Sequence, residues 1–88
     1  MRLCITLSSK IGIGCAIAIK LDNGLSKVGR VAISNACGIN IDQYLEICFK
    51  HNAVIHQYNG VLFENFNDAQ RCIKELEPYL ILNQLIGE

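Results

Sequence analysis

The sequence predicts an α+β domain in which two helices pack on one face of an antiparallel sheet of about five strands. Alternating apolar residues fill the first forty positions, an Asn-Gly pair separates two β-favouring runs, and two stripes of helical period each follow an asparagine. The expected order is β-β-β-α-β-β-α with a C-terminal extension, which is compatible with a ferredoxin-like arrangement. The 88 residues, 51% of them hydrophobic, are expected to form one domain over residues 1–88.

Three strands are expected before the first helix. Alternation of apolar and polar or small residues predicts strands over residues 3–7 and 15–21. Residues 22–24, Asp-Asn-Gly, have the composition of a turn and lead into a third strand over residues 26–34. Gly29 is a candidate bulge in that third strand.

The first helix is expected to begin at Asn40. Its side chain suits an N-cap, and Gln43 follows at capping-box spacing. We expect the helix to end near His51 and Asn52, because asparagine tolerates the left-handed conformation that closes a helix. The predicted apolar stripe consists of Ile41, Tyr44, Leu45 and Cys48.

A hairpin is expected next, with Asn59 and Gly60 as a two-residue type I′ turn. That register pairs His56 with Phe63 and Ile55 with Glu64, and it leaves His56 at least half buried. The predicted core face carries Val54, His56, Tyr58, Val61 and Phe63.

The last helix is expected to be capped by Asn67, with Gln70 three residues later. Its stripe consists of Ala69, Cys72, Ile73 and Leu76. Pro78 should break it, because proline lacks the N–H that the helix needs.

The tail beyond Pro78 is apolar and must be buried, either as a short strand or as a helix docked on a second subunit. A domain of this size buries only about 60–65% of its surface alone, so we expect a homodimer. The expected interface residues are Tyr79, Leu80, Leu82, Leu85 and Ile86.

Charge is zero overall but divided along the chain. Residues 1–40 hold five basic residues against one acidic residue, whereas residues 41–88 hold three against seven. An anionic ligand would therefore contact the first half. The candidate anion-binding residues are Ser9, Lys10, Gly12, Gly14, Lys27 and Arg30. The glycines resemble a phosphate loop in composition only, because a strand rather than a helix is expected to follow them.

Five cysteines without a CxxC pair are interpreted as reduced packing thiols rather than a disulfide framework. Cys37, before a helix start and with His51 or His56 as a base, is the candidate for a cysteine enzyme. Cys48, His51 and His56 have a spacing that would supply three metal ligands. No orienting carboxylate and no fourth ligand can be assigned, so we expect no cofactor and no metal.

These observations favour a small non-enzymatic binding module, a regulator or inhibitor that acts through macromolecular contacts as a homodimer. A protein partner is favoured over nucleic acid, because no aromatic residues interleave with the basic ones. The alternatives are a binder of small anions, nucleotides or oligonucleotides and, third, a cysteine enzyme. The longest apolar run falls short of the roughly 20 residues that cross a bilayer, so we expect no membrane contact. We expect a cytoplasmic location.

Overall fold

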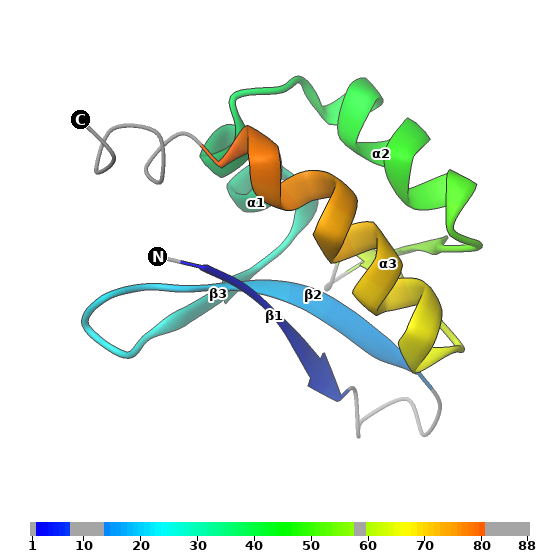
Figure 1. Cartoon of the computed structure of the whole chain (residues 1–88), viewed down its shortest axis with the longest axis horizontal. Coiled ribbons are helices and arrows are strands. Elements are labelled where there is room, and N and C mark those ends of the chain that lie inside the picture. Colours follow the sequence, from blue (N-terminus) through cyan, green and yellow to red (C-terminus); the bar gives the residue numbers. More distant parts are fainter. Residues whose placement is uncertain (1, 8–13, 58–59, 81–88) are drawn as a thin grey trace.

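The computed structural model of the chain describes residues 2–7, 14–57 and 60–80. Figure 1 shows the helices gathered on one side of the strands near the N-terminus. The elements in chain order are β1 (Arg2–Leu7), β2 (Cys15–Lys20), β3 (Ser26–Val28), α1 (Arg30–Cys37), α2 (Ile41–Lys50), β4 (Val54–His56), β5 (Gly60–Leu62), α3 (Phe66–Leu76) and the short 3-10 helix Glu77–Tyr79.

The α+β class is confirmed, but the five strands in the described residues form two antiparallel sheets rather than one. One sheet has the order β1-β2-β3, and the other consists of β4 and β5. A reciprocal pair of backbone hydrogen bonds joins them: the N–H of Cys15 donates to the carbonyl of Phe63, and the N–H of Phe63 donates back, both at 2.9 Å. A ferredoxin-like arrangement is not confirmed.

The expected third strand is wrong beyond Val28, because residues 30–37 form helix α1. Gly29 is the N-cap residue of this helix rather than a bulge. The helix buries Ile33 and Cys37, which lie four residues apart, and it ends at Gly38 in the left-handed conformation. The N–H of Ile39 then donates to the carbonyl of Ser34, a glycine-dependent helix ending.

Helix α2 begins where the sequence predicts. The side-chain oxygen of Asn40 accepts a hydrogen bond from the N–H of Gln43 at 2.7 Å, which confirms the N-cap. Asn52 has a φ of 67°, so the chain leaves the helix in the expected left-handed conformation. Tyr44 and Cys48 of the predicted stripe are buried, whereas Ile41 is exposed.

The predicted hairpin register is wrong by three positions. Val54 pairs with Leu62, Ile55 with Val61 and His56 with Gly60. Asn59, the first residue of the expected turn, lies outside the described residues, and so does Tyr58. Val61 and Phe63 are buried as expected, and His56 is partly buried, but Val54 is exposed.

Helix α3 starts one asparagine earlier than predicted. Asn65, rather than Asn67, is the N-cap, and its side-chain oxygen accepts from the N–H of Asn67 at 2.8 Å. All four residues of the predicted stripe are buried, which confirms the face that the helix turns to the core. The α-helix ends at Leu76, and Pro78 lies in the 3-10 helix that follows, so the expected break is confirmed.

The core lies between the sheets and the helices. Helix α3 contacts β1 and β2, while α1 packs beside β2, β3 and β5 (Figure 1). No helix in the described residues is long and apolar enough to cross a membrane. The core cluster consists of Leu3, Cys15, Ile17, Ile19, Ile33, Cys37, Tyr44, Ile47, Cys48, Ala53, Val61, Phe63, Ala69, Cys72, Ile73, Leu76 and Leu80.

Candidate functional site

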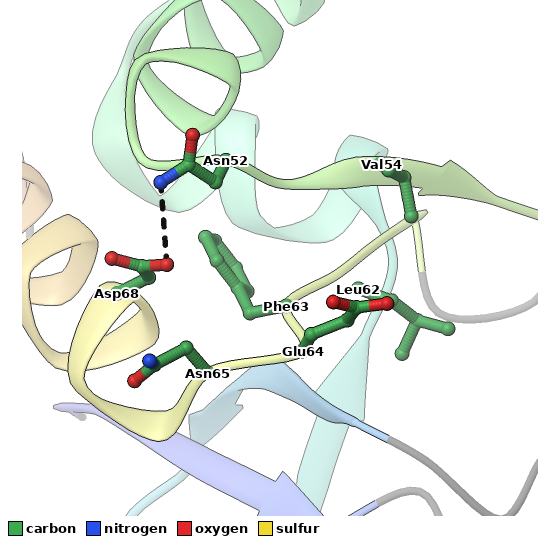
Figure 2. Close-up of a pocket in the computed structure, with 7 residues that line it drawn as sticks. All are labelled: Asn52, Val54, Leu62, Phe63, Glu64, Asn65 and Asp68. Carbon is green, nitrogen blue, oxygen red and sulfur yellow. Dashed lines mark hydrogen bonds between the residues drawn. The ribbon is translucent and has the colours of Figure 1, made fainter.

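A pocket of about 610 Å³ lies between the β4–β5 hairpin and the start of α3. Figure 2 shows the ring of Phe63 in the middle of the lining residues, with Asn52, Asn65 and Asp68 to one side and Val54, Leu62 and Glu64 to the other. Phe63 is fully buried, so its ring belongs to the core behind the pocket. The lining residues are Asn52, Val54, Leu62, Phe63, Glu64, Asn65 and Asp68.

The polar side of the pocket is organised around Asp68. The Nδ2 of Asn52 donates to Oδ2 of Asp68 at 3.3 Å (Figure 2), and the guanidinium of Arg71 donates to Oδ1 at 2.6 Å. The hydrogen bond from Arg71, and then the one from Asn52, hold the pKa of Asp68 below its usual range. Asp68 is therefore ionised at neutral pH. Glu64 adds an exposed carboxyl group on the other side of the pocket, beside Leu62 (Figure 2).

The apolar side of the pocket continues onto an exposed strand. Val54 and Leu62 are cross-strand partners and both line the pocket. Val54 and its neighbour Ile55 on β4 are 59% and 56% exposed. Within the part of the chain that the structure describes, β4 pairs only with β5, which leaves its outer edge without a strand partner. An exposed apolar edge is a template for pairing with another chain.

The candidate anion-binding residues that the structure describes do not form one group. Gly14 precedes β2, and a Cβ there would lie 3.0 Å from the carbonyl oxygen of Phe63, so this glycine permits the close approach of the two sheets. Lys27 pairs with Ile19 near the other end of β2, about 16 Å along the strand from Gly14. Lys27 is exposed. The other predicted residues Ser9, Lys10 and Gly12 lie outside the described residues.

Arg30 lies at another pocket, of about 410 Å³, formed where β3 meets α1 and the β4–β5 hairpin approaches. It is the first residue of α1, whose N-cap Gly29 has no side chain to accept from the free N–H groups of the first turn. No acidic residue occupies that turn. The lining residues are Val28, Gly29, Arg30, Val31, Ala32, Gln57 and Gly60.

The described part of the predicted dimer interface is divided between surface and core. Tyr79 is 41% exposed and is available for contacts. Leu80 is 1% exposed and belongs to the core cluster, so it packs within the chain. The remaining predicted residues, Leu82, Leu85 and Ile86, lie outside the described residues.

Cys37 does not have the surroundings of a reactive thiol. It is the last residue of α1, at the end of the helix dipole that disfavours a thiolate, and its Sγ donates to the carbonyl of Leu76 at 3.9 Å. Burial, and then the neighbouring Cys48, raise the pKa of its thiol to about 11. His51 lies elsewhere, with its Nε2 3.1 Å from Oε1 of Glu75. The described residues contain no cluster of three or more metal-binding side chains.

Sequence reasoning missed the pocket, because its polar residues were read only for local structure. Asn52 and Asn65 are each the residue at which one helix ends or begins, and the hairpin between them brings these two ends to one side of Phe63. The sequence feature that pointed to a polar site here was the presence of two asparagines, Asn65 and Asn67, at the start of one helix. The shifted strand register then brings Val54 beside Leu62.

Comparisons with known proteins assign no family to this chain. Neither a protein-family model, nor a curated protein, nor a solved structure matches it. The chemistry of the surface must therefore be argued from its own residues.

Proposed function

We propose that this chain is a non-enzymatic binding module that docks an extended segment of a protein partner along β4 and its adjoining pocket. By binding that segment, the chain would act as a regulator or inhibitor of the partner protein. The observation that supports the proposal is the exposure of Val54 and Ile55 on an edge strand, beside a pocket that Val54 and Leu62 line.

The arrangement suits addition of a strand. An extended segment that pairs with an exposed sheet edge gains affinity from backbone hydrogen bonds and specificity from alternate side chains that enter pockets. One such side chain, aliphatic or aromatic, would pack against Val54 and Leu62. A neighbouring basic side chain would reach the carboxyl groups of Glu64 and Asp68 on the rim. The preferred segment therefore alternates apolar residues and carries at least one lysine or arginine.

The charge of the pocket rim supports a protein partner over nucleic acid at this surface. Asp68 and Glu64 would repel phosphate groups, and the guanidinium of Arg71 is already paired with Asp68. The proposal for this surface thus excludes a phosphate backbone as its ligand on electrostatic grounds.

Affinity of defined peptides tests the proposal. Peptides selected from a random library against the chain would be labelled, and binding measured by fluorescence anisotropy. Val54→Asp should weaken binding at least tenfold, because it places a charge against the apolar side chain of the ligand. Leu25→Asp is the matched control, since Leu25 is 63% exposed and lies in the turn between β2 and β3, away from the pocket. Equal losses in the two variants, or no loss in Val54→Asp, would contradict the assignment.

Self-association through the C-terminal tail is a separate part of the proposal. Tyr79 and the predicted tail leucines supply the apolar surface, and Leu80 is excluded because it is buried in the core. Light scattering at tens of micromolar, a range in which modest interfaces associate, should give the mass of a dimer. Leu82→Glu combined with Leu85→Glu should return it to a monomer. A monomeric wild-type chain would count against the dimer and leave the peptide surface untouched.

A small-anion binder remains the second candidate, supported by the uncapped first turn of α1 beside Arg30. The free N–H groups and positive dipole end favour an anion there. Binding of a phosphate-bearing ligand should then fall steeply between about 50 and 200 mM salt when several phosphates are contacted. It should also weaken when Arg30, which lines the pocket at that turn, is changed to glutamate. Affinity that responds to neither change would rule this candidate out.

A further inference from the structure

Two cysteines from different helices meet in the core. Cys48 on α2 and Cys72 on α3 are both fully buried, and their sulfur atoms lie 3.8 Å apart, with the thiol of Cys72 donating to Sγ of Cys48. Both are free thiols in this structure. The other three cysteines are placed elsewhere: the sulfur of Cys15 donates to the carbonyl of Phe63, Cys37 donates to Leu76, and Cys4 lies partly exposed on β1.

The separation of the sulfurs is close to what a disulfide requires. A disulfide has an S–S length of about 2.05 Å, so each sulfur must move by roughly 0.9 Å. A rotation of each side chain supplies movement of this size. Among the hydrogen bonds of the described residues, Cys72 is the cysteine whose sulfur contacts the sulfur of Cys48, whereas the Cys37 thiol donates to the carbonyl of Leu76.

The two thiols are not equivalent. The hydrogen bond from Cys72 lowers the pKa of Cys48, against the opposing effect of burial, while the pKa of Cys72 is raised because its proton is held in that bond. Cys48 is therefore the more readily ionised of the two thiols, and Cys72 is placed to react second. The hydroxyl of Tyr44, one helical turn before Cys48, also lowers the pKa of Cys48.

We propose that Cys48 and Cys72 form a reversible disulfide between α2 and α3 when the chain meets a peroxide. The Cys48 thiolate attacks one peroxide oxygen, the O–O bond breaks, and the departing hydroxide takes a proton to leave as water. The sulfur of Cys72 then attacks the sulfenic acid of Cys48, the S–O bond breaks, the S–S bond forms, and a second water leaves. Two thiols lose two protons and two electrons, and the peroxide is reduced to two waters.

The crosslink would close a loop that contains the whole β4–β5 hairpin. Residues 49–71 lie between the two cysteines, and they include every residue that lines the pocket beside Phe63. A bond between the two helices that flank this segment restricts how far its ends separate. The oxidised chain is therefore more stable toward unfolding, and the disulfide forms slowly because both sulfurs are buried.

Peptide mapping of the oxidised wild-type chain tests the proposal directly. The chain would be treated with hydrogen peroxide, alkylated under denaturing conditions and cleaved after glutamate. Cleavage after Glu46, Glu64 and Glu75 places Cys48 in the fragment 47–64 and Cys72 in the fragment 65–75. The expected product is these two fragments joined, lighter than the sum of the free fragments by about 2 Da and separated by a dithiol reductant.

Two variants and a stability measurement complete the experiment. Cys37→Ala should retain the crosslink, whereas Cys72→Ala should lose it and leave a Cys48 sulfenic acid that dimedone traps. The midpoint of thermal unfolding of the oxidised wild-type chain should rise by at least about 5 °C and return on reduction. The proposal is overturned if all five cysteines are still alkylated after peroxide has oxidised a free-thiol control, or if another pair is joined. The wild-type mapping decides the matter even where a variant does not fold.

Discussion

Replacing Gly60 by alanine should destabilise the chain far more than replacing Gly24, although both glycines have a positive φ. Gly60 has a φ of +81° and begins β5, and a Cβ there would lie 2.7 Å from the backbone nitrogen of Arg30 and 3.2 Å from the carbonyl carbon of Gly29. Gly24 has a φ of +88° in the turn after β2, and a Cβ there would meet nothing within 4 Å. Comparing the two substitutions therefore separates the cost of the left-handed backbone conformation from the cost of steric overlap at position 60.

The magnitudes follow from these two terms. An alanine in the left-handed conformation lowers the free energy of unfolding by roughly 1–2 kcal/mol. The lower conformational entropy of the unfolded chain with alanine raises it again by about 0.4–1 kcal/mol. Gly24→Ala should therefore lower the free energy of unfolding by about 1 kcal/mol. Gly60→Ala carries the same term and also overlaps with backbone atoms that have no rotamer to change, which adds roughly 1–3 kcal/mol. Its expected cost is about 2–4 kcal/mol.

Urea unfolding followed by far-ultraviolet circular dichroism measures the difference. With a slope of about 1 kcal/mol per molar for a domain of this size, the midpoint should fall by about 1 M in Gly24→Ala and by about 2–4 M in Gly60→Ala. Costs that agree within about 0.5 kcal/mol would show that a side chain at position 60 has as much room as one at position 24. The β4–β5 hairpin would then not rest against the start of α1 as the structure has it.

Two further predictions concern the helices. Asn40→Ala should lower the free energy of unfolding by about 1 kcal/mol because it removes the N-cap of α2, whereas Asn67→Ala should leave it unchanged because Asn65 caps α3. Chemical denaturation of both variants measures the difference, and equal losses of stability would contradict the prediction. Hydrogen bonds from Lys50, and then from His51, hold the pKa of Glu75 below its usual value. This ion pair should therefore stabilise the chain above about pH 4.3 and lose its effect as pH falls through the lowered pKa. In a pH series of melting curves, the melting temperature of Glu75→Gln should fall less steeply at acid pH than that of the wild-type chain.

The parts of the fold that depend on neighbouring residues could be predicted from the sequence. Asn40 caps α2 through its own side chain and the N–H of Gln43, and both partners lie within one turn of the chain. The buried stripe of α3 follows from helical period alone. Pro78 ends that helix because of its own missing donor.

The parts that were wrong depend on contacts between distant residues. Val31 and Ile33 favour a strand, but Ile33 instead enters the core from helix α1, which Gly38 terminates. The Asn59-Gly60 pair favours a two-residue turn, but the pairing of Phe63 with Cys15 fixes the position of β5. In the observed register Val54 lies opposite Leu62 rather than on the face of Val61 and Phe63, and it is exposed. The pocket is a consequence of this register, and so it could not be predicted.

A nuclear magnetic resonance titration of the wild-type chain with a library-selected peptide tests the proposed docking surface most directly. The largest amide shifts should fall on β4 and on the pocket residues Leu62, Glu64 and Asp68. Nuclear Overhauser contacts should also join the peptide backbone to the backbone of Val54 or Ile55, as strand addition requires. Shifts centred on Lys27 and Arg30, or on Tyr79, with β4 unchanged, would contradict the account.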